Sequence, residues 1–388
     1  MKLIRALQDD AIRRRREKVY DATSMAVTAR LLEINPEVLT AWNFRREAIA
    51  AFERERRGSP SDATEDHEPL CGVSARAKPN VDAREVGNLA DELALTERCL
   101  RKHPKSYPTW HHRKWCVARL ARGEDSESED VSSLLETELS MSRSLLDLDD
   151  RNFHGWGYRR FVVKLTSTRG GGSKKRAPAE VGEEDVFFRD RASALSELRY
   201  SEEKIERNFS NYSAWHHRAA YLPRAFSSSS SVAGTREPNA NEGDGAETRE
   251  NASGGDDERN ERPSLAFVPE RVLADEYALV RQALFTEPED QAGWMYHRWL
   301  TAQTLNNFKQ RAEGDEEAEK LVFAGEADAL AELCLLEPEC KWPVLTLARL
   351  CDLKGTEAGA AESAARFDRL KRLDPTRSGF YCDCGGRA

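Results

Sequence analysis

Several features that define large classes of protein are missing from this 388-residue sequence. It has no run of 18 apolar residues that could form a transmembrane helix, and its N-terminal segment lacks the apolar stretch of a secretory signal. Its eight cysteines include no CxxC pair. Several lie in helix-like segments, where a buried, reduced thiol is the usual state. These absences predict a cytoplasmic protein without disulfides.

A basic excess and the common catalytic signatures are also missing. The formal net charge is −9, which argues against a general nucleic-acid binder. No catalytic triad, Walker loop, dinucleotide fingerprint or zinc signature is present. The adjacent His111 and His112 cannot both point one way on a helix, and Cys382 and Cys384 lack a second ligand pair. The chain is therefore predicted to hold no complete active site, no cofactor and no metal of its own.

The sequence does contain one motif repeated five times. The copies read NPEVLTAWNFRREAI, HPKSYPTWHHRKWCV, DDRNFHGWGYRRFVV, NFSNYSAWHHRAAYL and EPEDQAGWMYHRWLT. Their tryptophans are Trp42, Trp110, Trp156, Trp215 and Trp294. The residues three positions later are Arg45, Arg113, Arg159, Arg218 and His297, and in the fifth copy Arg298 follows at once. Five of the eight tryptophans of the chain lie in these copies, which chance does not produce, so the motif predicts a repeat protein.

An amphipathic segment with apolar residues at helical spacing precedes each motif, so the repeating unit is a helix, a short turn and a second helix that begins near the tryptophan. One such hairpin cannot bury its apolar stripe alone and must stack on neighbours. The pattern predicts an all-α solenoid of antiparallel hairpins, forming a single domain over residues 1–388. Each tryptophan would be a wedge between hairpins, and each arginine would anchor the unpaired carbonyls at neighbouring helix ends.

Polar, low-complexity insertions separate the repeats. The smallest spacing, from Trp110 to Trp156, is 46 residues, and the longer ones contain Gly-, Ser- and charge-rich stretches. These stretches, at about 57–85, 166–185 and 226–263, are predicted to be disordered. Each follows the tryptophan helix, which leaves the rim of tight turns free. A degenerate sixth unit contains Trp342, and the helix after it is predicted to cap the array.

Candidate functional residues lie on this free rim, just before two of the tryptophans. The second turn contains Lys105, Ser106 and Tyr107, and the third contains Arg151, Asn152, Phe153 and His154. Such groups at helix N-termini suit an anionic ligand, because the helix dipole and free backbone N–H groups already favour negative charge there. The alternative from the residues alone is that they are solvated turn residues.

The five motifs resemble the repeats of the protein prenyltransferase α subunits. The copies RNFHGWGYRRFV, NFSNYSAWHHR and DQAGWMYHRWL, and the segment LEPECKWPVLTLARL, are most similar to the α subunit type of Rab (type II) geranylgeranyltransferases. The resemblance covers roughly residues 15–381 apart from the insertions. It implies a right-handed superhelical crescent that wraps a catalytic β subunit. Unlike animal members, the chain has no segment for a leucine-rich or β-sandwich domain.

The resemblance also implies a reaction and its residues. Lys105, Tyr107 and His154 would be catalytic and would bind the isoprenoid diphosphate together with Asn152. A geranylgeranyl group would pass from geranylgeranyl diphosphate to C-terminal cysteines of Rab GTPases, which an escort protein presents. The β subunit would supply zinc and the lipid pocket, so this chain would be half of an obligate heterodimer.

Two other functions remain open. The chain resembles, less closely, the α subunit shared by farnesyltransferase and type I geranylgeranyltransferase. It could also be a non-catalytic helical scaffold, although such arrays usually repeat every ~34 residues. A reader of one RNA base per repeat would need a strict period and a basic surface, and the sequence has neither.

Overall fold

The computed structural model describes residues 2–58, 88–122, 128–169, 191–226, 268–309 and 324–385. The chain divides into two compact units, residues 1–187 and 188–388, and each is considered by itself. Within the described ranges the regular elements are helices, and none is a β-strand. None of these helices is both long enough and apolar enough to span a bilayer. A single domain over 1–388 stays a prediction.

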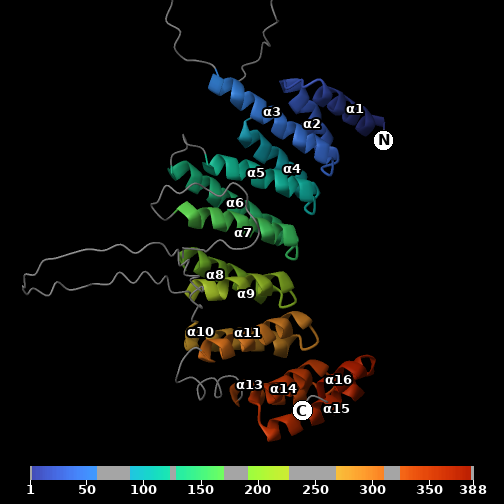
Figure 1. Ribbon diagram of the computed structural model, residues 1–388, viewed down its shortest axis with the longest axis vertical. Coiled ribbons are helices and arrows are strands. Elements are labelled where there is room, and N and C mark those ends of the chain that lie inside the picture. The colour runs from blue at the N-terminus through green and yellow to red at the C-terminus, as the bar shows by residue number, and fades with distance from the viewer. Residues whose placement is uncertain are drawn as a thin grey trace, which may run out of the picture. The chain divides into compact units, whose positions relative to one another are not determined.

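Unit 1 begins with one N-terminal helix, and a stack of antiparallel helix hairpins follows it along the chain (Figure 1). Its helices are α1 (Lys2–Arg16), α2 (Ala22–Ile34), α3 (Leu39–Gly58), α4 (Leu89–Lys102), α5 (Tyr107–Arg122), α6 (Ser128–Leu148) and α7 (Phe153–Arg169). The short turns that join α4 to α5 and α6 to α7 lie at the same edge of the unit, on the right in Figure 1.

Unit 2 continues the same hairpin pattern and ends in additional C-terminal helices. It contains α8 (Arg191–Arg207), α9 (Tyr212–Phe226), α10 (Glu270–Thr286), α11 (Gln291–Lys309), α13 (Glu326–Leu336), α14 (Lys341–Lys354), α15 (Glu357–Leu373), the 3-10 turn η2 (Pro375–Arg377) and α16 (Ser378–Gly385). The helix predicted as a cap is α15, which packs against α14. The predicted all-α solenoid of stacked hairpins is confirmed.

The three predicted insertions fall almost entirely outside the described residues. Only their first residues are described, and these continue the preceding helices: 57–58 belong to α3, 166–169 to α7 and 226 to α9.

Each motif tryptophan closes the turn that precedes it. All five side chains are buried, and in each the indole Nε1 donates a hydrogen bond of 2.8 Å to the carbonyl oxygen six residues earlier. Trp110, for example, donates to Pro104. The side chain therefore satisfies a carbonyl of the turn and fills the core of the hairpin at once. This explains why the tryptophan stands at a fixed distance after the turn.

In unit 1 the same turn carbonyls also connect successive hairpins. The oxygen of Pro104, which accepts from Trp110, also accepts a hydrogen bond of 2.8 Å from Nδ2 of Asn152 in the next turn. Pro36 is placed in the same way, since it accepts from its own Trp42 and at 3.5 Å from Oγ of Ser106. Each turn is thus held against the next one at its edge.

Buried Arg–Glu pairs join the hairpins along their length. The arginine three residues after the tryptophan binds a glutamate in the first helix of the following repeat through two nitrogens, in the pairs Arg45–Glu92, Arg113–Glu138 and Arg218–Glu276. All six side chains are buried. A guanidinium has enough donors to bind a carboxylate with two nitrogens and a carbonyl with the third.

The remaining donors point into the arginine's own repeat. Arg45 donates to the carbonyl of Met25, and Arg113 donates to that of Leu93. These carbonyls lie within the first helix of the hairpin. The prediction that the arginines bind the last, unpaired carbonyls of neighbouring helices was therefore wrong in its target. The motif position faces the body of the adjacent helix rather than its end.

Four glutamates in the first helices of the hairpins (Glu92, Glu138, Glu197 and Glu276) also contact the residue two positions after the tryptophan of their own repeat. His112 lies 2.9 Å from Glu92 and His217 lies 2.8 Å from Glu197. Hydroxyl donors take this place in two other repeats, where Tyr158 and Tyr296 donate to Glu138 and Glu276 at 2.5 Å.

The fifth motif departs from this pattern. His297 occupies the arginine position, and its Nε2 lies 3.1 Å from Glu326 in the next hairpin. Arg298 was predicted to substitute as the anchor, but it is exposed and has no ion pair among the described residues. One step along the helix turns the side chain by about 100° and away from the hairpin boundary.

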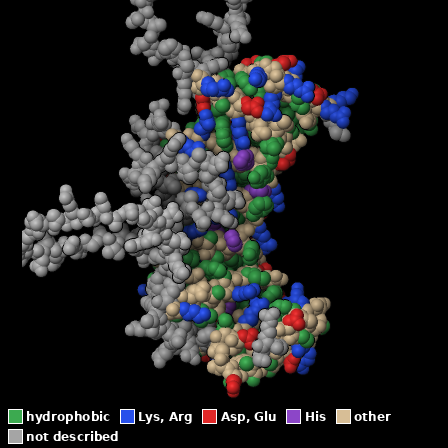
Figure 2. Space-filling model, in the orientation of Figure 1, with side chains coloured by type: hydrophobic (Ala, Val, Ile, Leu, Met, Phe, Trp, Pro, Cys, Tyr) green, Lys and Arg blue, Asp and Glu red, His purple; other side chains and the backbone are tan. Residues whose placement is uncertain are grey.

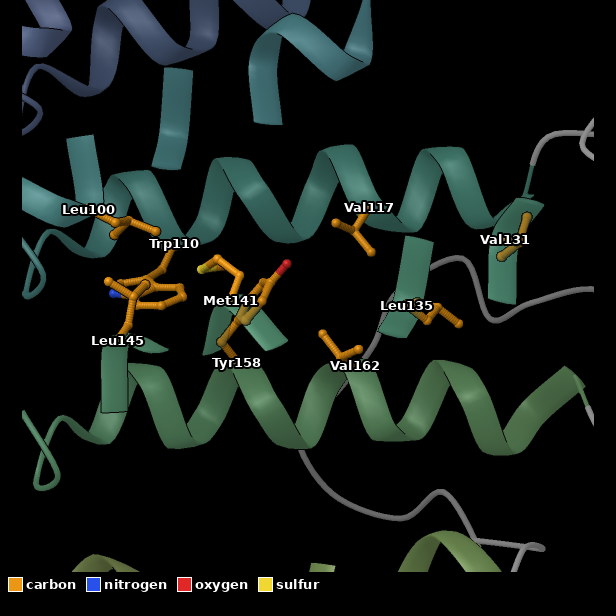
Figure 3. Packing of buried hydrophobic residues seen from close by; sticks show 9 residues of the cluster. All are labelled: Leu100, Trp110, Val117, Val131, Leu135, Met141, Leu145, Tyr158 and Val162. Carbon is orange, nitrogen blue, oxygen red and sulfur yellow. The ribbon is translucent and has the colours of Figure 1, made fainter. Parts of the chain in front are cut away.

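Apolar side chains fill the space around these polar contacts. In the cluster of Figure 3, Trp110 and Val117 of α5, Met141 of α6, and Tyr158 and Val162 of α7 pack together. Trp110 lies toward the tight turns, and the valines lie farther along the two helices. The tryptophan therefore begins a continuous apolar seam between hairpins, which one hairpin could not bury alone.

The pair of Arg45 with Glu92 gives a pH-dependent prediction. Burial alone would raise the pKa of Glu92, but the hydrogen bond from His112 and the charge of Arg45 outweigh it and lower the pKa to about 2. Glu92→Gln should lower the free energy of unfolding at pH 7 by about 3–5 kcal/mol, because it leaves Arg45 buried and unpaired. Urea unfolding of the chain measures this difference.

The sign of the pH effect follows from the lowered pKa. The stability that ionised Glu92 contributes is present above its ordinary pKa of about 4.5 and is lost as the pH falls toward about 2. The gap between wild type and Glu92→Gln should therefore narrow below pH ~4.5. Glu97→Gln, which breaks the surface pair with Arg101 on the same helix, is the control and should change stability by less than ~1 kcal/mol. A gap that stayed constant down to pH ~2.5 would contradict this assignment.

Asn152 gives a second prediction, because its two side-chain atoms have separate tasks. Its Oδ1 accepts from the backbone N–H groups of His154 and Gly155, which caps α7, while its Nδ2 holds Pro104. Asn152→Asp keeps the capping oxygen but removes the donor. We expect a loss of about 1–2 kcal/mol in the free energy of unfolding. Asn35→Asp should be nearly neutral, because the side-chain oxygen of Asn35 accepts from Glu37 and its nitrogen has no hydrogen bond within the described ranges, and an equal loss there would refute the connecting role.

Candidate functional site

The residues predicted to bind an anion lie on two adjacent turns of unit 1. Lys105 belongs to the turn between α4 and α5, and His154 follows the turn between α6 and α7. The hydrogen bond from Asn152 to Pro104 joins the two turns, so the N-termini of α5 and α7 are held next to each other. The fold therefore brings together residues that are far apart in sequence.

Lys105 is an accessible cation of these turns, with 77% of its side chain exposed. Its Nζ lies 3.6 Å from Oδ2 of Asp149, at the end of α6. An exposed pair at this separation stabilises a protein by about 0–1 kcal/mol, so it holds the lysine only weakly. A more highly charged anion could replace Asp149 as its partner.

Tyr107 and His154 face each other across the two turns. Their ring centroids are 5.9 Å apart, and Tyr107 is 64% exposed. The ring of His154 also packs against that of Phe153, with the two ring centroids 3.9 Å apart. Tyr107 stacks on His111 at 6.1 Å. Sequence reasoning missed His111, although its spacing of four residues from Tyr107 on one helix was the available signal.

Asn152 is placed differently from the other candidates. It is buried, and both atoms of its side-chain amide are hydrogen-bonded to the backbone. It therefore fixes the position of His154, whose backbone N–H it accepts at 3.1 Å, and presents little surface to a ligand.

The electrostatics of the cluster favour a neutral imidazole. Partial burial, and next the positive charge of Lys114, lower the pKa of His154. The same two causes, with Arg46, act on His111 and lower its pKa as well. At pH 7 both rings are accordingly neutral, and each can donate one N–H. The positive charge at the rim comes from Lys105 and from the exposed Arg151 rather than from histidine.

This arrangement can bind an anion but cannot by itself activate a nucleophile. A lysine ammonium, a phenol and a neutral imidazole are all hydrogen-bond donors at helix N-termini, where negative charge is already favoured. In the part of the chain that the structure describes, no three His, Cys, Asp or Glu side chains are grouped so that they could hold a metal ion. Figure 2 shows histidines among hydrophobic and basic side chains on one face of the molecule.

Comparison with known proteins identifies the repeats. The model of the protein prenyltransferase alpha subunit repeat matches residues 89–120, 135–166, 195–225 and 273–304. These ranges contain Trp110, Trp156, Trp215 and Trp294 with the helices around them.

Curated relatives give the same result. The chain is 31% identical over 300 residues to the geranylgeranyl transferase type-2 subunit alpha of Rattus norvegicus, covering 77% of this chain and 37% of that protein. It is 28% identical over 383 residues to the subunit of the same name from Dictyostelium discoideum, covering 98% and 88%. The chain thus spans little more than a third of the rat relative but most of the Dictyostelium one.

A solved structure has a similar fold. Candida albicans protein geranylgeranyltransferase-I complexed with GGPP matches with a TM-score of 0.58 at 15% sequence identity, covering all of this chain and 90% of the other. At this identity the likeness concerns the fold alone. Taken together with the four matched repeats and the curated relatives, these findings place the chain in the protein prenyltransferase alpha subunit family.

Proposed function

We propose that this chain is the α subunit of a heterodimeric protein geranylgeranyltransferase of the Rab type. The observation that carries the proposal is the cluster of Lys105, Tyr107 and His154 on adjacent turns, with the rings of the last two 5.9 Å apart. A cationic donor beside two neutral hydrogen-bond donors suits a diphosphate, whose oxygens are anionic acceptors. The names of the curated relatives support the type II enzyme.

The proposed role of this cluster is to stabilise the leaving group. When a cysteine, deprotonated to the thiolate, attacks geranylgeranyl diphosphate, the carbon–sulfur bond forms, the carbon–oxygen bond breaks and negative charge builds up on the leaving diphosphate. Donors that are fixed before the reaction stabilise this charge more than they stabilise the ground state. Lys105 supplies a full positive charge, and Tyr107 and the neutral His154 supply hydrogen bonds.

Two neighbouring residues have supporting roles in this proposal. Asp149 holds Lys105 until the diphosphate replaces it as partner, which costs little because the pair is exposed. Asn152 was predicted to contact the diphosphate. Its buried, fully engaged side chain supports a positioning role through His154 instead.

The other half of the site would come from a β subunit. We propose that this partner holds the lipid chain in its pocket and binds a zinc ion, which would hold the substrate cysteine as a nucleophilic thiolate. Rab GTPases, presented by an escort protein in the cytoplasm, would be the protein substrates. The isolated α chain should be inactive.

Replacing Lys105 tests the proposed site directly. In the assembled heterodimer, Lys105→Ala should lower the single-turnover rate of geranylgeranyl transfer by roughly 10²–10³, the usual effect of removing one fixed donor to developing charge. Lys102→Ala is the matched control, because Lys102 is an exposed lysine in the last turn of α4. The control should transfer at the wild-type rate. Equal rates for all three proteins would exclude Lys105 from the reaction.

His154 should make a smaller contribution, because a neutral donor is weaker than a charged one. His154→Ala is expected to lower the single-turnover rate about 10-fold, and His154→Gln, which keeps an N–H donor, should lose less. Since the pKa of His154 is lowered from its ordinary value, the neutral form of its ring predominates at pH 7 and above. The ratio of the wild-type rate to the His154→Ala rate should therefore change little from pH 7 to 8.5. A ratio that falls steeply over this range would show a charged imidazole.

A further inference from the structure

A second feature of the surface lies in unit 2, in a groove formed by α11, α14 and α16. Its volume is about 790 Å³. Met295 and Leu305 of α11, Leu353 of α14 and Phe380 of α16 form apolar parts of its lining. Three of these, Met295, Leu353 and Phe380, are exposed by 45–53%. Large apolar side chains gathered in one groove indicate an interaction site more strongly than scattered ones.

The charged residues of the groove are mostly basic. Its lining includes one carboxylate, that of Asp352, and four basic residues, Arg298, Lys309, Arg349 and Arg377. Arg377 is paired with Asp374 at 2.7 Å. Arg298 and Arg349 form no ion pair with any residue that the structure describes. Burial, and next the charge of Arg298, lower the pKa of Arg349. Two arginines therefore repel each other at the surface of an apolar groove.

The same motif position is occupied differently in unit 1. Four residues after the tryptophan, Arg46 lies over the ring of Trp115 at 5.7 Å, and Lys114 lies over the ring of Phe161 at 5.8 Å. In both cases the ring stands five residues after the tryptophan of the next repeat. Arg298 has the corresponding position in the fifth motif, but the residue five after Trp342 is Leu347. The cation–π partner that is present at these two boundaries of unit 1 is absent there.

The length of the groove limits what can fill it. Its lining on α11 runs from Trp294 to Lys309, which corresponds to about 23 Å of helix. Apolar residues recur along this stretch, and cations stand near both ends. A small anion would reach one end alone. An extended or helical segment of a protein, with acidic and apolar side chains, would contact the whole groove.

We infer that this groove of α11, α14 and α16 docks an acidic amphipathic segment of the partner subunit. The inference rests on the proposed function for the existence of that partner and adds a specific surface for it. Carboxylates of the segment pair with Arg298 and Arg349, and its apolar side chains cover Met295, Leu353 and Phe380. Pairing removes the repulsion between the two arginines, and burial of the apolar side chains adds affinity.

Charge reversal in the heterodimer tests this docking. The double variant Arg298→Glu/Arg349→Glu should weaken association with the β subunit about 100-fold in Kd, measured by titrating a labelled α chain with β. The wild-type Kd should rise with salt, and this dependence should be weaker in the variant. Arg271→Glu is the matched control, since Arg271 is an exposed arginine on α10 outside the groove. Circular dichroism and melting of the free chain check that all variants fold.

A second pair of variants covers the case in which the double reversal fails to fold. Arg298→Gln and Met295→Ser alter exposed side chains, and each should weaken association by about 10-fold. A Kd equal to that of wild type in folded groove variants would overturn the inference. A second result would also overturn it. If the free wild-type chain binds geranylgeranyl diphosphate, and the charge-reversed variant loses this binding but keeps the wild-type Kd for β, the groove holds a small amphiphile instead.

The same experiment separates the two proposals. If the wild-type chain binds no β subunit, the proposed function fails and the docking inference fails with it. If the wild-type heterodimer forms and transfers geranylgeranyl, and the groove variants associate as tightly as wild type, the docking inference alone fails.

Discussion

Three boundaries between successive hairpins depend on a buried arginine and a buried glutamate that come from different repeats, in the pairs Arg45–Glu92, Arg113–Glu138 and Arg218–Glu276. A charge taken out of water is costly unless its partner is correctly placed, so a pair such as Arg113–Glu138 tolerates little displacement of one hairpin against the other. Apolar packing alone would allow sliding. The ion pairs, together with the tryptophan at each turn, fix the register of the stack.

The candidate site is a consequence of that register. Tyr107 and His154 follow different turns, so no contact between residues close together in the sequence sets their separation. Their 5.9 Å distance follows from the Arg113–Glu138 pair between the hairpins and from the Asn152 amide that holds Pro104 at the edge. The interior of the stack therefore positions groups on its rim, although none of the interior residues would touch a ligand.

The sequence was sufficient for the fold because its strongest signals are local. Tryptophan followed by arginine, and apolar residues at helical spacing, can be read along a single chain. The partners of the arginines could not be read, because Glu92 looks like any acidic residue on the polar face of an amphipathic helix. Its partner, Arg45, belongs to the preceding hairpin and lies 47 residues earlier in the sequence. The same holds for Asn152, whose second bond reaches 48 residues back to Pro104.

The two members of each arginine–glutamate pair come from neighbouring repeats. This division bears on how such a chain could gain or lose whole repeats. The second repeat contributes Glu92 to the boundary on its N-terminal side and Arg113 to the boundary on its C-terminal side. Duplicating or deleting a whole unit of this kind would regenerate a matched boundary, whereas a cut inside a unit would leave one charge stranded. The fifth motif, with His297 in place of arginine, is where such an exchange would create a mismatch.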